Sequence, residues 1–286
     1  MTATPQSHSP DGLEFGPRRK SFDIEAVLAT DWHGGNAFRT AWFNSMSMLF
    51  PLGEKFFIDS VRHFKDQVED SQLLAEIGGF QAQEATHRLQ HQKYNELLCK
   101  ARGYDLLRFE KNERARIEWA NREMSAIRRL AGTVASEHLT AIMAHDMLTR
   151  KDSLVDADEQ VASLWRWHGV EETEHKAVAF DVYLAVRGTV RGRRLAMIHS
   201  TIFFFKDTFR NLFIMLRNDG KLWSPRVWLS GLKFLFVKPG ILRRMFIPWL
   251  KFFRKDFHPW QNDNRHLVDE WQQEEDRIQS AVHLSG

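Results

Sequence analysis

The chain of 286 residues contains a single cysteine, Cys99. One cysteine excludes an internal disulfide and a cysteine-based metal site, and it fits a reducing cytosol. The sequence has no run of about 20 uncharged apolar residues, so we predict no membrane-spanning helix. The first 20 residues are polar and contain no apolar core of a secretory signal. We therefore expect a cytoplasmic protein.

Several sequence patterns that would point to other folds or chemistries are also missing. There is little alternation of apolar and polar residues, so few strands are expected, and no repeat at a period of 20–50 residues is visible. No Ser-His-Asp arrangement, G-x-S-x-G motif or phosphate-binding loop occurs. A hydrolase that works without a metal is therefore not indicated.

Charge is unevenly distributed along the chain. The net charge is only +3, but residues 187–258 carry 16 Lys and Arg against 3 Asp, a local charge of +13. The rest of the chain must then carry 3 − 13 = −10. We expect the acidic part and the basic part to have different roles.

Helical spacing of apolar residues predicts an all-α protein. Four long helices are expected at residues 54–68, 71–102, 113–150 with a break near Gly132, and 159–186, joined by short links typical of an antiparallel four-helix bundle. Further helices are expected at 195–216, 226–237, 240–255 and 264–283. We divide the chain into a flexible tail (1–30), the bundle (31–187) and a basic aromatic extension packed on the bundle (188–286).

The segment 165–183, WRWHGVEETEHKAVAFDVY, contains His168, Glu172 and His175. Because a helix turns by about 100° per residue, these three side chains leave one face of one helix, within roughly 60° of each other. Apolar residues such as Trp165 and Val182 continue the same face. Burying such a row of histidine and glutamate is costly unless something binds it, and a metal is the obvious candidate.

Matching residues occur on the other predicted bundle helices. Glu84 and His87 form a second Glu-x-x-His pair on an apolar stripe, and Glu54 and Glu137 are lone carboxylates on the two remaining helices. A di-metal carboxylate site in a helix bundle uses a Glu from each of two helices and a Glu-x-x-His from each of the other two. Four carboxylates bring a charge of −4 into the interior, which two divalent ions would cancel.

The sequence therefore predicts two divalent metal ions, with iron first and manganese or zinc as alternatives. We predict seven ligands: Glu54, Glu84, His87, Glu137, His168, Glu172 and His175. Of these, Glu84 and Glu172 are the predicted catalytic carboxylates, and one of them is expected to bridge the ions. A single Glu-x-x-His usually lies on a solvated face, so the prediction depends on the complete set.

Other polar residues are expected to support the ligands rather than bind metal. Candidates for orienting the histidines are Asp59, His91, His138, Glu171 and Asp181. We interpret His91 and His138 as surface or supporting residues. Because Glu54 follows Pro51 closely, the sequence places Glu54 in the first turn of its helix.

The ligand pattern resembles the ferritin-like di-iron superfamily. His168, four residues before Glu172, makes it similar to the seven-ligand arrangement of the arylamine N-oxygenases, which implies that His168 binds the same ion as the pair that follows it. From about Phe38 to Trp271 the chain resembles a bacterial family of predicted metal-dependent hydrolases. The resemblance rests on FPLGEKFF, QAQEATHRLQH, ASEHLTA, the segment WHGVEETEHKAVAFDVY, and FHPW at Phe257–Trp260.

Two reactions fit such a site. Two ferrous ions bind and split dioxygen to oxidise a small, apolar substrate, which is the reaction we favour from the residues. Alternatively, a metal-activated water hydrolyses a bond, as the family resemblance implies. A non-enzymatic helical protein, acting at a membrane surface or as an interaction partner, is the third hypothesis. Iron storage is disfavoured by the large basic extension.

Residues 191–255 mix Phe and Trp with Lys and Arg and contain almost no acid. One interpretation is that these helices pack on the bundle or form a homodimer interface, with the cations solvated outside. The other is a basic, aromatic surface that lies on the inner face of a membrane and delivers an apolar substrate. No recognised nucleic-acid-binding motif accompanies the charge, so no nucleic-acid partner is expected.

Overall fold

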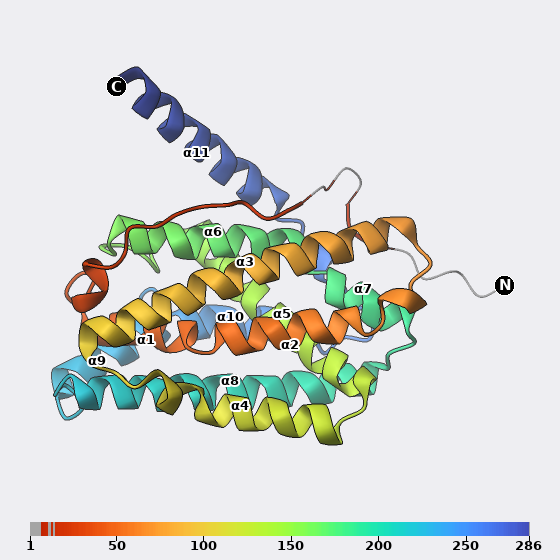
Figure 1. Cartoon of the computed structure of the whole chain (residues 1–286), viewed down its shortest axis with the longest axis horizontal. Helices are drawn as coiled ribbons and strands as arrows, with labels where there is room; N and C mark the ends of the chain where they lie inside the picture. The colour runs from red at the N-terminus through yellow and green to blue at the C-terminus, as the bar shows by residue number, and fades with distance from the viewer. Residues whose placement is uncertain (1–6, 11–12, 14, 286) are drawn as a thin grey trace.

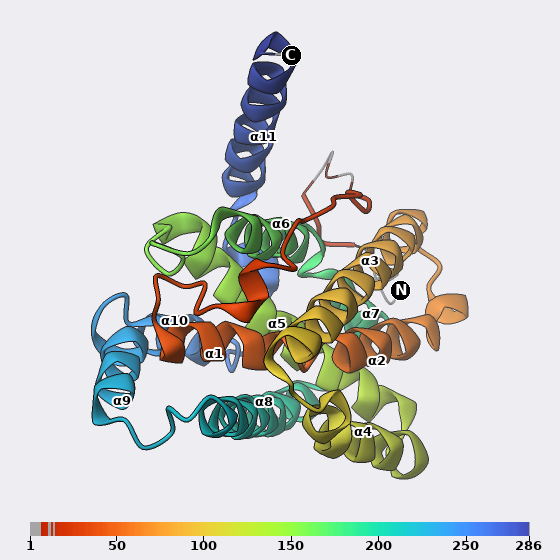
Figure 2. The same ribbon diagram turned by 60° about the vertical axis from the view of Figure 1, so that its left-hand side comes forward.

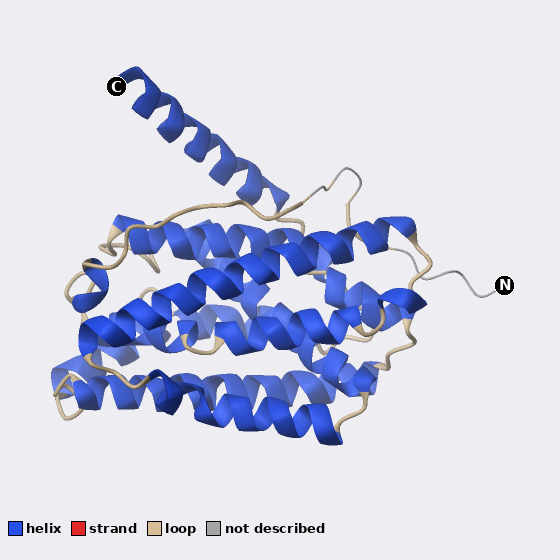
Figure 3. Ribbon diagram, viewed as in Figure 1, coloured by secondary structure: helices blue, strands red, loops and turns tan. Residues whose placement is uncertain are grey.

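The computed structural model describes residues 7–10, 13 and 15–285. Within these residues the chain forms helices and no strand, apart from one isolated bridge between His33 and Ala157 (Figure 3). The all-α prediction is therefore confirmed. None of the described helices is long and apolar enough to cross a membrane.

Four helices carry the predicted ligands: α2 (Phe50–Arg62), α3 (Ser71–Arg102), α5 (Ala126–Arg150) and α6 (Glu159–His175). Helices α2 and α3 pack together, as do α5 and α6, and further contacts join α2 to α5 and α3 to α6 (Figure 1). Each of the four therefore contacts two of the others around a shared interior. Placement in the ferritin-like superfamily stays a prediction.

Local sequence explains where two of these helices begin and end. Helix α3 begins after Asp70, whose side chain accepts a hydrogen bond from the backbone N–H of Leu73, and it ends at Gly103 in the left-handed conformation. Helix α6 begins after Asp158, which caps Gln160 and Val161 in the same way. Both bounds of α3 and the start of α6 match the predicted ones.

Three boundaries differ from the prediction. The expected break near Gly132 lies instead at Met124 and Ser125, whose extended backbone separates α4 (Leu106–Glu123) from α5. Helix α6 is separated from α7 (Val178–Ala185) by a turn at Lys176. Because α2 begins at Phe50, directly after α1 (Ala37–Ser47), Glu54 lies in the second turn rather than the first.

The basic extension consists of α8 (Val190–Asn218), α9 (Pro225–Leu232), a π-helical turn (Lys233–Val237), α10 (Ile241–Lys251) and α11 (Arg265–Ser285). Helix α8 packs on α1 and α5, α9 packs on α1, and α10 packs on α5. Figure 2 shows α9 at the outer edge of the molecule, away from α3. Helix α11 contacts α6 at its base and projects outward (Figure 1).

The N-terminal segment runs along the side of the molecule formed by α6 and α3, with one short 3-10 helix at Val27–Ala29 (Figure 1). Residues 1–6, 11–12 and 14 of the predicted flexible tail lie outside the described residues. The described part makes specific hydrogen bonds: Ser7 donates to Glu76, and Arg18 pairs with Glu174. Nothing in the sequence pattern pointed to these contacts, which bear on the site described next.

Candidate metal centre

Helix α6 presents three of the predicted ligands to the interior. His168, Glu172 and His175 are all buried. Glu172 Oε1 lies 3.0 Å from His168 Nε2 and 3.5 Å from His175 Nε2. The spacing of four and three residues therefore places both imidazoles against one carboxylate.

Helix α3 contributes Glu84 and His87, which have no solvent exposure. His87 Nδ1 lies 3.6 Å from the same oxygen of Glu172, and Glu84 Oε1 lies 3.2 Å from His175 Nε2. Glu84 and Glu172 thus lie between predicted ligands of α3 and α6, as a carboxylate that bridges two ions would.

The lone carboxylates complete the cluster. Glu54 of α2 approaches His168 Nε2 to 3.9 Å, and Glu137 of α5 approaches His175 Nε2 to 3.5 Å. All seven predicted side chains are therefore brought together from four helices. Their donor atoms fall into compact groups, including Glu84–Glu137–His175, Glu54–Glu84–His87 and His87–His168–Glu172. Glu84 occurs in groups around both His87 and His175, so the cluster has room for two ion positions rather than one.

The hydrogen bonding of the cluster fits metal ions. Among the described residues, nine buried side-chain atoms of six predicted ligands have no hydrogen-bond partner: both carboxylate oxygens of Glu54, Glu84 and Glu137, together with Glu172 Oε2, His87 Nδ1 and His175 Nε2. Leaving buried polar atoms unpaired costs about 1–3 kcal/mol each. Oxygen and imidazole donors of this kind are the ligands of iron, manganese and zinc.

The electrostatics of the cluster lead to the same conclusion. Burial, together with repulsion from Glu84 and Glu172, raises the pKa of Glu54 and of Glu137 well above 4.5. Burial also raises the pKa of Glu84 to about 7, although His175 opposes it. Divalent cations would remove this repulsion and allow all the carboxylates to ionise.

The comparison with known families agrees with this geometry. A family model described as "Predicted metal-dependent hydrolase" matches residues 16–263. The chain belongs to this family. Membership indicates a metal-dependent enzyme, and the description of the family names hydrolysis as its predicted reaction. No curated protein and no solved structure matches the chain.

In this family member, the ring nitrogen of His87 that faces away from the cluster is held by a carboxylate. His87 Nε2 donates to Glu171 Oε2 at 2.9 Å, and Glu171 Oε1 accepts from the backbone N–H of Arg18 at 2.7 Å. The proton is therefore on Nε2, and the Nδ1 lone pair points into the cluster.

An amide orients His175. His175 Nδ1 donates to Gln83 Oε1 at 2.9 Å, and the amide nitrogen of Gln83 donates to Glu174 Oε2 at 2.8 Å. Glu174 is held in turn by the guanidinium of Arg18. This chain fixes the orientation of the amide and directs His175 Nε2 into the cluster.

His91 orients the third histidine. Ser47 Oγ donates to Asn95 Oδ1 at 2.7 Å, so it accepts from His91 Nδ1 at 2.9 Å. Burial holds the pKa of His91 well below 6.5, so its ring is neutral and Nε2 accepts from His168 Nδ1 at 2.8 Å. His87 and His168 thus each present one unprotonated nitrogen to the cluster. Burial lowers the pKa of His175, but Glu172 and Glu84 raise it overall well above 6.5, so an ion would displace the proton from its Nε2.

The predicted supporting residues divide clearly. Glu171 and His91 contact ligands as described, whereas Asp59 is half exposed in an ion pair with Lys55, and His138 contacts the carbonyl of Pro248. Gln83, Glu174 and Arg18 were missed. Gln83 and Glu174 each precede a predicted ligand by one residue, but no periodic signal marks Arg18.

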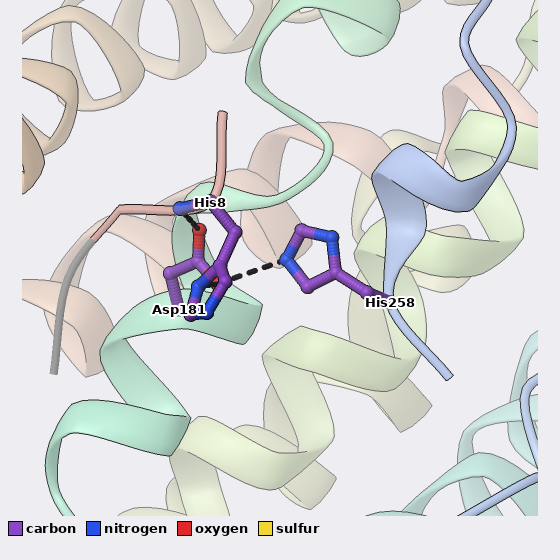
Figure 4. A group of neighbouring side chains, drawn as sticks. All are labelled: His8, Asp181 and His258. Atoms are coloured by element: carbon purple, nitrogen blue, oxygen red, sulfur yellow. Dashed lines mark hydrogen bonds and ion pairs between the residues drawn. The ribbon is translucent and has the colours of Figure 1, made fainter. Parts of the chain in front are cut away.

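Asp181 belongs to a second cluster, with His8 and His258 (Figure 4). Its buried carboxylate accepts from the backbone N–H of His8 at 2.9 Å and from His258 Nε2 at 2.9 Å. His258 Nδ1 accepts from the backbone N–H of Trp260, so the proton is on Nε2. A protonated nitrogen donates to the carboxylate and does not bind a metal, so we interpret this cluster as a hydrogen-bonded clasp.

A narrow cavity of about 60 Å³ reaches the metal centre at His168 and Glu172. Its lining is mostly apolar, with Thr140, Asp146 and Ser153 as polar side chains. The main apolar contributors are Trp42, Phe43, Met46, Phe50, Met143, Met147 and Trp165. A substrate that enters here meets the ligands from an apolar side.

Proposed function

We propose that this protein is a dinuclear metal enzyme that oxidises a small, apolar substrate. The observation that carries the proposal is a buried set of four carboxylates and three imidazoles, with unpaired donor atoms, at the end of an apolar cavity. The proposed ligands are Glu54, Glu84, His87, Glu137, His168, Glu172 and His175. Iron is the proposed metal, because carboxylate and imidazole donors suit it.

When bound, two ferrous ions would supply the electrons that reduce dioxygen. The protein's own residues hold the site for this chemistry. Glu171, Gln83 and His91 fix the tautomers of the three histidines, so each ring points its lone pair at the same place. The Trp, Phe and Met side chains of the cavity exclude water and hold an apolar substrate next to Glu172.

Hydrolysis is the second candidate, and the description of the family favours it. A metal-activated water would attack a polar bond of the substrate, and Asp146, Thr140 and Ser153 would have to orient that polar group. These side chains are a minority of a lining dominated by aromatic and methionine side chains. The apolar lining is therefore the reason to place oxidation first.

Metal analysis tests the proposal and separates the two reactions. Protein purified without chelator should contain about two irons per chain, and the ferrous form should change its absorbance when exposed to air. Two zinc or manganese ions without oxygen reactivity would favour hydrolysis. If the wild-type protein contains no metal after gentle purification and takes up none on reconstitution, both the oxidation and the hydrolysis proposals are refuted.

We also propose that the protein works at the surface of an anionic membrane. Residues 220–255 contain no acidic residue. Large apolar side chains are exposed on α9, α10 and the flanking turns: Trp223 (90%), Leu229 (71%), Leu232, Phe236, Phe246 and Ile247. Arg226, Lys233, Lys238, Arg243 and Lys251 are exposed beside them. This combination of apolar and basic side chains is typical of a helix that lies in the membrane interface.

A second copy of the chain fits this α9–α10 surface less well, because a two-fold interface would place its cations against one another. Co-flotation with phosphatidylglycerol vesicles at low salt, and not with phosphatidylcholine vesicles, is the expected result. Ile247→Glu should abolish flotation. Leu107→Glu, at an exposed leucine of α4, is the matched control and should float normally. Equal flotation of both variants would contradict the proposal.

A further inference from the structure

A second, much larger cavity lies between α2, α4, α5 and α8. Its volume of about 1080 Å³ is at the upper end of ligand sites, which span roughly 300–1,000 Å³. It is separate from the narrow cavity at the metal centre, but Phe50 and Thr140 line both. Gly53 and Ser136, which immediately precede the predicted ligands Glu54 and Glu137, also line it.

The middle of this cavity is apolar. The side chains that line it include Phe56, Phe57, Ile117, Leu195, Phe203 and Phe204. Leu195 and Phe203 remain substantially exposed. Such a lining favours an aliphatic or aromatic chain over a polar ligand.

One end of the cavity is cationic. Arg187 and Arg191 line it at the N-terminus of α8, and both are exposed without an ion pair among the described residues. Helix N-termini prefer acidic side chains, yet α8 has none in its first turn and carries Arg191 there instead. The helix dipole and the two guanidinium groups therefore act together on any anion bound at this end.

The other end holds a buried carboxyl group. Glu113 of α4 is buried, and its Oε2 has no hydrogen-bond partner among the described residues. A Cβ built on Gly53 would lie 3.7 Å from Glu113 Oε1, which places this carboxyl beside the helix that carries Glu54. Burial raises the pKa of Glu113 well above 4.5, which weakens the repulsion that this carboxyl group would exert on an anion.

The length of the cavity sets the size of the ligand. Its lining residues on α8 run from Thr189 to Phe204, a span of about 22 Å at 1.5 Å per residue. Arg116 lies over the ring of Phe203 at this far end and ion-pairs with Asp207, so its charge is already compensated. Arg128 and Arg129, near the N-terminus of α5, also line the cavity and have no acidic partner among the described residues. The uncompensated cations are thus at the N-termini of α5 and α8, and the apolar surface extends from there toward the metal centre.

We propose that this cavity binds a long-chain fatty acid, with its carboxylate at Arg187 and Arg191 and its chain directed toward Phe50 and Thr140. Phe50 and Thr140 separate the acyl chain from His168, whose ring centroid lies 5.1 Å from that of Phe50. The assignment of this ligand as the enzyme's substrate rests on the proposed function. The binding itself does not.

Calorimetric titration of the purified protein with dodecanoate, below its micelle concentration, tests the site. Dodecanoate should bind at least about tenfold more tightly than dodecanol, and dodecylammonium should not bind, because only the acid satisfies the two arginines. The double variant Arg187→Gln/Arg191→Gln should weaken dodecanoate binding by about tenfold or more. Arg150→Gln, at an exposed arginine of α5 outside the cavity, should leave it unchanged.

A variant that fills the cavity provides a second test of the fatty-acid site. A Cβ on Gly132 would meet only Phe56, at 3.9 Å, so Gly132→Leu projects a side chain into the cavity without a clash and removes a helix-weakening glycine. This variant should lose dodecanoate binding. Gly78→Leu, on the open face of α3 where a Cβ meets nothing, is the matched control and should bind normally.

Three results overturn the proposal: no binding of dodecanoate by the wild type, equal binding of dodecanol, or normal binding by Gly132→Leu. Metal content is measured on the same samples. Two metal ions without dodecanoate binding would reject the fatty-acid site and leave the proposed function standing. Dodecanoate binding by a protein that contains no metal would support the fatty-acid site and reject the proposed function.

Discussion

Removing the metals should make the stability of this protein depend on pH in a specific direction. In the metal-free protein the pKa values of Glu54 and Glu137 lie well above 4.5 and that of Glu84 is about 7, mainly because of burial. A carboxyl group whose pKa is raised on folding binds its proton more tightly in the folded state. Its contribution to stability is therefore lost as the pH rises through the folded-state pKa.

Two buried histidines, His87 and His91, act in the opposite direction, but only at lower pH. His175 acts in the same direction as the raised carboxyl groups: burial lowers its pKa, but Glu172 and Glu84 raise it overall well above 6.5. Burial holds the pKa values of His87 and His91 well below 6.5. Their contribution to the free energy of unfolding therefore rises only until the imidazoles of the unfolded chain have lost their protons, and it stays constant at higher pH. Above about pH 6.5 the cluster itself contributes only its raised groups. Lys176, which is not a predicted ligand, acts in the opposite direction: burial lowers the pKa of its ammonium to about 7, so its contribution to stability rises with pH in metal-free and metal-bound protein alike. Glu84 alone should then cost about 1 kcal/mol of folding free energy between about pH 6.5 and pH 8, and Glu54 and Glu137 add to this.

Chemical denaturation of chelator-treated protein across this pH range measures the effect. With rising pH, the free energy of unfolding of the metal-free protein should fall relative to that of protein reconstituted with two metal ions, because the contribution of Lys176 cancels in this difference. Metal-free Glu84→Gln should show a slope smaller by about 1 kcal/mol over the same range. A stability difference between the two forms that does not grow above about pH 6.5 would refute this account of the cluster.

Other perturbations have separate readouts. Glu172→Ala should empty at least one metal position by elemental analysis, because Glu172 contacts all three histidines. Glu171→Gln should weaken metal affinity by about 10–100-fold in a chelator competition, whereas Glu76→Gln, a buried carboxyl group remote from the cluster, should not. Gly169→Ala would place a Cβ 2.6 Å from Met147 Cε and push that side chain. Turnover should fall while metal content is unchanged.

Much of the candidate centre could be predicted from the sequence, because helical periodicity decides which side chains share a face. The spacing of His168, Glu172 and His175 on one helix requires no tertiary information, and the structure places them against one another. The same reasoning selected Glu54, Glu84, His87 and Glu137. Whether these seven side chains bind metal stays a prediction that the proposed metal analysis tests.

Helix boundaries were less well predicted. Gly132 has the weakest helix propensity in its segment, yet it lies inside α5, and the break occurs at Met124 and Ser125. A glycine costs a helix only about 1 kcal/mol, which packing against neighbouring helices outweighs. The capping residues Asp70 and Asp158 act through their own backbone neighbours, so those helix starts were predictable.

The sequence by itself determined which side chains point inward along each helix, because an α-helix turns by the same angle, about 100°, at every residue. Only the tertiary structure decided how they are held. Arg18 reaches Glu171 and Glu174 from more than 150 positions away, and the orientation of His168 depends on His91. Contacts of this kind leave no periodic trace, because they form between segments whose separation along the chain is unrelated to any helical repeat.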